Sequence, residues 1–229
     1  MYFLVGLDIA NGESVKKLSK VGVMNVILHP TYFPSIASFV AIVKASNLIF
    51  EVADNYQKQT YRNRCHIYGA NGKLTLNIPV HHTHKNRQLY KDVAISNEIN
   101  WQIQHWKSLQ SAYRTSPFFE FYADELASLF LTNEQNLMAF NFKCFSKILN
   151  CLQLDINYQK TASFEKKVNN TVDLRSMVNA RKEKPIELES YTQVFENKHG
   201  FMSNLSILDL IFNEGPNALN YLESQHINI

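Results

Sequence analysis

The sequence predicts an α/β protein with a βαβ-like N-terminal sheet that carries a β-hairpin, followed by a mostly helical C-terminal half. Three observations lead to this fold class. Two short apolar runs near the start flank an apolar segment of helical composition. An Asn-Gly pair then joins two alternating runs. From residue 97 onward, apolar residues recur at spacings of three and four, as in amphipathic helices.

The first unit runs from "NVIL" through "HPTYFPS" to "NLIFEV". Pro30 and Pro34 forbid a regular helix between the runs and force an extended loop. Ser35 is placed to cap the helical segment "IASFVAIVKAS". We therefore expect residues 24–28 and 47–52 to form neighbouring parallel strands, with this helix as the crossover.

The hairpin is predicted for "TYRNRCHIYGANGKLTLNIPV", with its turn at Asn71-Gly72. If the first arm is extended, alternation separates its side chains into two sets. One face carries Arg62, Arg64 and His66, and the other carries Cys65 and Ile67.

The remaining chain is predicted to be mainly helical. We expect a helix over residues 98–114, a second that begins with Ser116 as N-cap and Pro117 in its first turn, and a third in "NEQNLMAFNFKCFSKILNCLQL". "DINYQK" predicts a return to strand, and the polar stretch 169–187 predicts a loop. The tail predicts three short helices, with Gly200 and Gly215 at helix ends.

Composition limits the classes of function. The 229 residues suffice for one sizeable core, and a net charge of +3 is too small to indicate nucleic acid binding. Three cysteines without CxxC spacing favour a reducing compartment. Neither a signal peptide nor an apolar run near the ~20 residues of a membrane span is evident, so we expect a cytoplasmic protein. The sequence leaves the oligomeric state open.

A cationic face is the first candidate site. Arg62 and Arg64, roughly 7 Å apart at Cα on an extended strand, offer two planar donor forks to a diphosphate or to two carboxylates. Lys58 and Lys85 are placed to add charge from flanking loops. The alternative is an exposed hairpin face with solvated charges.

The loop after the first strand is the second candidate. His29 follows that strand, and Tyr32 and Phe33 are placed to form a wall for a base or sugar, in front of a helix N-terminus. Asp54 follows the second strand and is a candidate base or ribose ligand, and His105 is a candidate acid or base from the first long helix. The structural alternatives are a turn with buried aromatics, an exposed loop acid and a packed helix face.

No metal site is predicted, because His81, His82 and His84 have no carboxylate or thiolate at ligand spacing. GxSxG, P-loop and GxGxxG patterns do not occur, so the sequence identifies no cofactor.

Four blocks in order resemble the WbqC-like family: "HPTYFPSIASF", "YQKQTYRNRCHIYGANGKLTLNIPV", "INWQIQHWKSLQSAYRTSPFFEFY" and "NLSILDLIFNEGPNALNYL". The resemblance runs from about Met24 to Leu222. The chain departs from the family's first block, where His29 replaces a Gln and Ala37 or Ser38 replaces a Gly. We expect residues 1–23 to be an N-terminal extension and 24–229 a single WbqC-like domain, with an α/β part (24–96) and a mainly helical part (97–229).

The resemblance implies work in bacterial surface-polysaccharide biosynthesis, such as O-antigen, and leaves the reaction open. Two hypotheses follow. The first is a transferase that acts on an activated, phosphate-containing donor such as a nucleotide sugar, with the arginines on phosphate and the His29 to Phe33 loop positioning the donor. The second is a non-catalytic binding or scaffold protein of a polysaccharide assembly pathway.

Overall fold

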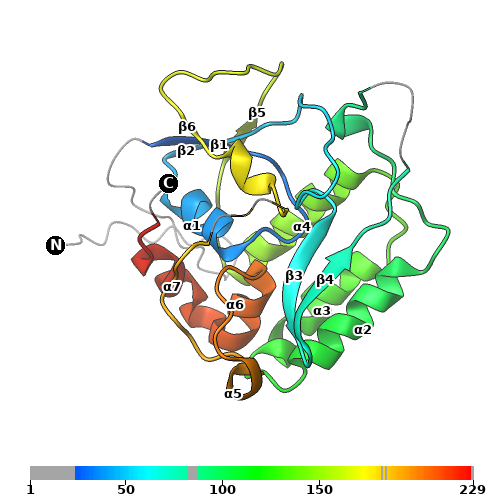
Figure 1. Ribbon diagram of the computed structural model, residues 1–229, viewed down its shortest axis with the longest axis vertical. Coiled ribbons are helices and arrows are strands. Elements are labelled where there is room, and N and C mark those ends of the chain that lie inside the picture. Colours follow the sequence, from blue (N-terminus) through cyan, green and yellow to red (C-terminus); the bar gives the residue numbers. More distant parts are fainter. Residues whose placement is uncertain (1–23, 82–86, 182, 184, 228–229) are drawn as a thin grey trace, which may run out of the picture.

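A four-stranded parallel sheet organises the N-terminal part of the protein (Figure 1). The computed structural model describes residues 24–81, 87–181, 183 and 185–227. The strand order is β5-β2-β1-β6, and all neighbouring pairs are parallel. The strands are β1 (Asn25–Leu28), β2 (Asn47–Phe50), β5 (Tyr158–Lys160) and β6 (Val172–Asp173). The predicted βαβ unit is confirmed, and both of its strands lie in the centre of the sheet.

Helix α1 (Ile36–Lys44) makes the crossover between β1 and β2. Ser35 is its N-cap, as predicted, because the Ser35 hydroxyl accepts a hydrogen bond from the Ser38 amide. Val26 and Leu28 of β1 belong to the main core, whereas Ile27 points to the opposite face of the sheet. In Figure 1 the helices lie on one side of this sheet, and the segment that follows β5 loops over the other side.

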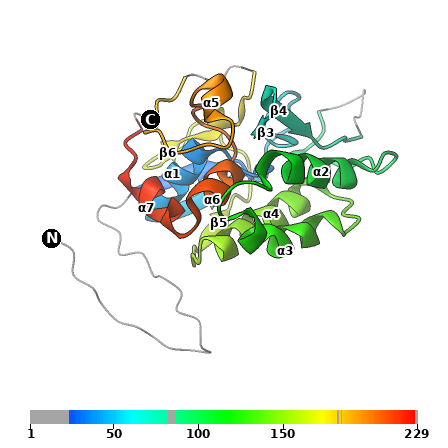
Figure 2. The ribbon, with the colours of Figure 1, turned by 90° about the horizontal axis from the view of Figure 1, so that it is seen from below.

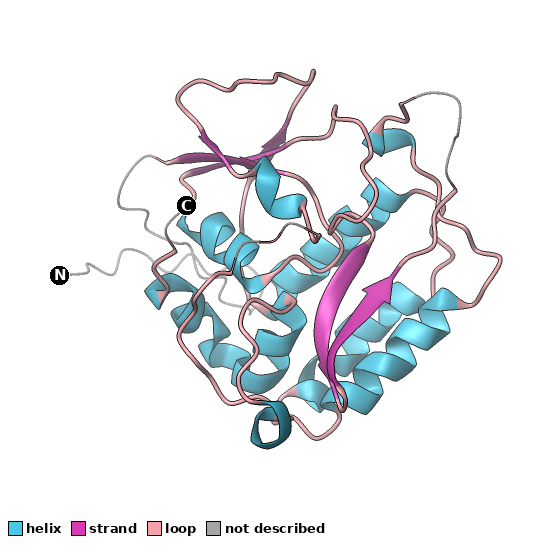
Figure 3. Ribbon diagram, viewed as in Figure 1, coloured by secondary structure: helices cyan, strands magenta, loops and turns pink. Residues whose placement is uncertain are grey.

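The hairpin is formed by β3 (Arg64–Gly69) and β4 (Gly72–Asn77), separate from the four-stranded sheet (Figure 3). Two details of the prediction are wrong. Gly69 pairs with Gly72, so the turn residues are Ala70 and Asn71, and Gly72 follows them at φ +100°, which favours glycine. The first arm begins at Arg64, because Arg62 lies in a turn before it, so the two arginines do not share a strand face.

Three long helices build the half of the molecule opposite α7 (Figure 2). They are α2 (Trp101–Tyr113), α3 (Phe119–Phe130) and α4 (Leu137–Cys151). The predicted start of the second helix at Ser116 is wrong by two residues. The Ser116 hydroxyl donates to the Tyr113 carbonyl and closes α2, while the Phe118 amide donates to the Phe212 carbonyl. Helix α3 therefore begins only after Phe118.

The C-terminal segment returns to α1. Helices α5 (Glu196–His199), α6 (Ile207–Glu214) and α7 (Ala218–Ser224) are the three short helices that the sequence predicts. The polar stretch 169–187, predicted to be loop, instead supplies β6 and the 3-10 helix η2 (Arg175–Val178). Two further 3-10 turns are η1 (Tyr90–Asp92) and η3 (Gly215–Asn217).

Candidate active site

The carboxyl ends of the four parallel strands meet at one edge of the sheet. His29 follows β1, Glu51 follows β2 and Thr161 follows β5. The chain moves from β1 outward to β2 and β5, and then places β6 on the other side of β1. This order has its topological switch point between β1 and β6. In open parallel sheets, ligands bind in the crevice outside the carboxyl ends at such a point.

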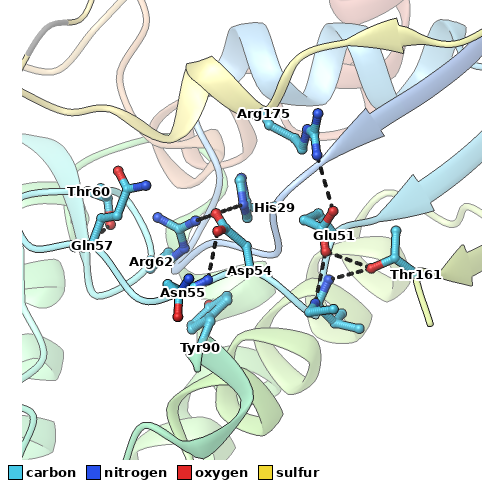
Figure 4. Close-up of polar contacts among 12 residues, drawn as sticks. His29, Glu51, Asp54, Asn55, Gln57, Thr60, Arg62, Tyr90, Thr161 and Arg175 are labelled. Atoms are coloured by element: carbon cyan, nitrogen blue, oxygen red, sulfur yellow. Dashed lines mark hydrogen bonds and ion pairs between the residues drawn. The ribbon is translucent and has the colours of Figure 1, made fainter. Parts of the chain in front are cut away.

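A buried cluster of three polar side chains occupies this edge (Figure 4). The Nε2 atom of His29 lies 3.0 Å from Oδ2 of Asp54, and a guanidinium nitrogen of Arg62 donates to the same oxygen at 2.9 Å. The side chains of His29 and Arg62 are 4% and 0% exposed, and that of Asp54 is 11% exposed. The Asn55 amide also donates to Asp54. We call these three residues the His29 cluster.

The charges in the His29 cluster balance when the imidazole is neutral. Burial lowers the pKa of His29, with a contribution from the positive charge of Arg62, against the hydrogen bond to Asp54. Burial alone would raise the pKa of Asp54, but the contacts with His29 and Arg62 outweigh it and lower the pKa. Asp54 is therefore ionised and accepts a hydrogen bond from the Nε2–H group of His29. The Nδ1 atom of His29 then carries a lone pair.

Several polar atoms of the cluster have no hydrogen-bond partner among the described residues. They are Nδ1 of His29 and two guanidinium nitrogens of Arg62, all buried. The Arg62 guanidinium lies over the Tyr90 ring at 5.2 Å, which compensates part of its lost hydration. An unpaired buried donor or acceptor costs about 1–3 kcal/mol. The cluster therefore retains both an unused proton acceptor and unused cationic donors.

Beside the His29 cluster, Glu51 is held from two sides. Oε1 of Glu51 accepts from the Thr161 hydroxyl at 2.7 Å and the Ala53 amide at 2.9 Å, and Oε2 lies 3.3 Å from Arg175 (Figure 4). Arg175 also bonds Asp173 at the end of β6. The sequence reasoning missed both Glu51 and Arg175. The signal for Glu51 was a carboxylate within the last two residues of the second predicted strand.

The comparison with protein families found one match. A model of the "WbqC-like protein family" matches residues 29–184, more than half of the chain.

The chain belongs to the WbqC-like protein family.

The matched residues begin at His29 and include the His29 cluster, Glu51 and Arg175, whereas they end before α6 and α7. The chain is also 24% identical over 222 residues to "Uncharacterized protein Rv1507c" of Mycobacterium tuberculosis, a match that covers 86% of this chain and 96% of the relative. No solved structure is significantly similar to the chain.

The aromatic loop of this WbqC-like chain lies in the core. Tyr32 and Phe33 are 0% and 1% exposed, so their rings offer no open surface to a ligand in this structure, and their predicted stacking role stays a prediction. The Tyr32 hydroxyl lies 3.0 Å from Nδ1 of His105. His105 is itself buried, and burial lowers its pKa to about 4. The structure thus places His105 with Tyr32 in the core, and not with the His29 cluster.

The predicted cationic residues are distributed over several places. Arg64 is half-buried at the start of β3, and its buried Nε has no hydrogen-bond partner among the described residues. Burial raises the pKa of Tyr56 to about 12, and the positive charges of Arg64 and Arg62 oppose this rise. Lys58 is exposed in the loop after Asp54.

Two further observations concern metals and membranes. Lys85, His82 and His84 lie outside the described residues. Within the residues that are described, no group of three or more His, Cys, Asp or Glu is arranged to hold a metal ion. No helix in the described part of the chain combines the length and apolarity needed to cross a membrane.

Proposed function

We propose that this WbqC-like protein is a transferase-type enzyme that acts on an activated, phosphate-containing donor, and that the His29 cluster is its reacting centre. The observation that carries the proposal is the pairing of neutral His29 with ionised Asp54 at the carboxyl edge of a parallel sheet, next to its switch point. An imidazole oriented by a carboxylate, with its second nitrogen unpaired, is a typical general base.

The proposed step is a proton-coupled transfer. The acceptor's O–H or N–H proton passes to Nδ1 of His29, and the acceptor's lone pair forms the new bond to the donor. The donor's bond to its phosphate leaving group breaks, and the electrons of that bond stay on the leaving oxygen. Unused N–H groups of Arg62 and Arg64 then stabilise the charge that develops there.

Access to the His29 cluster is part of the proposal, because His29 is only 4% exposed. The segment 55–60 lies beside the cluster, and its residues 57–59 are exposed (Figure 4). We propose that this segment moves when the donor binds, as loops at active sites commonly do. Exposed Lys58 is then placed to meet the donor's phosphate.

The proposed pathway is bacterial surface-polysaccharide biosynthesis, for which family membership is the support. We propose the cytoplasm as its location, where nucleotide-linked donors are the expected ligands. Cys65, Cys144 and Cys151 are all unpaired and buried, which is consistent with a reducing compartment.

A thermal-shift screen against nucleotide sugars, acyl donors and aminoacyl donors tests the proposal. A ligand at a hundred times its dissociation constant stabilises the fold by about 2.7 kcal/mol, or about 5–10 °C for a chain of this size. Arg64→Ala should abolish the shift by a phosphate donor and leave the unliganded melting temperature within about 2 °C, since exposed or half-exposed charges contribute little. Lys91→Ala, at an exposed lysine of η1, is the matched control and should respond like the wild type.

A protein that no donor stabilises would favour the non-catalytic binding or scaffold function. Equal donor affinity in Arg64→Ala and wild type would remove Arg64 from the site.

A further inference from the structure

An open pocket of about 310 Å³ lies on the sheet face that the helices leave uncovered. Ile27 of β1 and Ile49 of β2 form its floor. Its wall is the segment 161–171, which connects β5 to β6. The pocket is distinct from the His29 cluster, whose three residues do not line it.

The wall of this pocket is anchored along its length. The Thr161 amide donates to the Phe50 carbonyl at 3.0 Å, and the Asn25 amide group donates to the Asn170 carbonyl at 2.9 Å. Arg175 donates to the Glu165 carbonyl at 2.7 Å. Because both ends and the middle of the segment are bonded to the sheet region, the pocket is formed before any ligand binds.

The charged side chains that line the pocket are carboxylates, and its hydroxyl and amide groups can both donate and accept hydrogen bonds. The Thr161 hydroxyl donates to Glu51 and accepts from the Val52 amide, and the Thr171 hydroxyl donates to the Asn169 carbonyl, so each hydroxyl keeps a lone pair for a ligand. Glu51 and Glu165 supply these carboxylates, and no lysine or arginine among the described residues lines the pocket. Such a lining disfavours phosphate, which accepts hydrogen bonds, and favours a ligand whose hydroxyl groups donate them.

We propose that this pocket binds a hydroxylated ring, either the ribose of a nucleoside or a hexose. Its volume is at the lower end of the roughly 300–1,000 Å³ of small-molecule sites, which suits one ring. The isoleucine floor offers an apolar surface to a ring face. Glu51 acts here as a positioning residue, because it orients the Thr161 hydroxyl.

This inference goes beyond the phosphate chemistry proposed for the His29 cluster. The two proposals can be refuted independently, because the binding of a ring is measured without turnover. Saturation-transfer NMR on the full chain, with uridine and methyl α-glucoside as probes, tests it directly. We expect transfer to at least one probe. Thr171→Val preserves the side-chain shape and removes the acceptor, and it should weaken binding about tenfold.

Thr132→Val is the matched control, because the Thr132 hydroxyl also donates to a backbone carbonyl but lies at the end of α3. It should bind like the wild type. Glu165→Gln is a second variant, and it should fold like the wild type because position 165 is exposed. It should weaken binding of the probe at least threefold, because it removes a charged hydrogen-bond acceptor. Transfer to uridine alone assigns the ring to a nucleoside, and transfer to the glucoside alone assigns it to a sugar. Absence of transfer to both probes overturns the proposal, as does wild-type affinity in Glu165→Gln and Thr171→Val.

Discussion

Replacing Asp54 with asparagine tests whether the His29 cluster is held by charge. The substitution keeps the size of the side chain and one acceptor oxygen, but it leaves the fully buried Arg62 cation without its counter-charge. Removing one partner of a buried ion pair typically costs about 3–5 kcal/mol. Asp54 is 11% exposed and asparagine still accepts one hydrogen bond, so we expect a loss of stability at the lower end of this range, about 3 kcal/mol.

The assay is thermal unfolding followed by circular dichroism at pH 7. For a chain of 150–250 residues, about 3 kcal/mol corresponds to a fall in melting temperature of about 6–12 °C. Asp155→Asn, at an exposed aspartate after α4, is the matched control and should stay within about 0.5 kcal/mol of the wild type. A melting temperature of Asp54→Asn within 2 °C of the wild type, measured with the same precision as the control, would refute the claim that Asp54 neutralises Arg62.

Three further predictions concern stability. Gly215→Ala should cost more than about 3 kcal/mol, because the new Cβ would lie 2.5 Å from the Phe118 ring at φ +51°. Gly200→Ala, at φ +72° and ψ 179° with open space, should cost only the backbone strain, about 1–3 kcal/mol; equal losses in chemical denaturation would disprove the clash. The pKa of His105 falls from 6.5 to about 4 on folding, so the unfolded state takes up its proton first as the pH drops. Stability should then decline between pH 6.5 and 4, by about 3 kcal/mol from this residue. His105→Gln should make the decline smaller in a urea titration, while His29 and His66, whose pKa values burial also lowers, keep part of it. Deletion of residues 1–22 should leave the melting temperature unchanged, since their sequence has no apolar periodicity, and a large fall would make the segment structural.

The N-terminal strands, helix and hairpin could be predicted because their signals are local. The apolar runs, the loop with Pro30 and Pro34 and the Ser35 cap all lie within a few residues of the element that they define. Strand β6 could not be predicted in this way. It is two residues long, and it pairs with β1, which lies some 145 residues earlier in the chain. Arg175, which follows β6, was therefore missed as well.

The site shows the same division between local and distant causes. That His29 and Asp54 lie close together could be predicted, because each follows a predicted strand and parallel strands bring such residues to one edge. The alternation of side chains along a strand could not predict the burial of Arg62. That burial depends on the Asp54 carboxylate, eight residues earlier, and on the Tyr90 ring. Likewise, Tyr32 and Phe33 have the same local sequence whether their rings face solvent or the core. Their burial follows from packing against distant rings such as Phe140 and Phe130.

The turnover rate of the His29→Gln variant tests most directly the central claim, which is that His29 acts as a base in the reacting centre. Glutamine, the residue that His29 replaces in the family's first block, keeps a hydrogen-bond donor for Asp54 but lacks a basic nitrogen. The proposed role of His29 as a base is therefore specific to this chain, and His29→Gln separates it from the structural role of the side chain. With a donor identified by the thermal-shift screen, we predict that His29→Gln binds it within about threefold of the wild type and transfers it at least about a hundredfold more slowly, the usual effect of losing a general base. Unchanged turnover in a folded His29→Gln protein would contradict the proposal that the His29 cluster is the reacting centre.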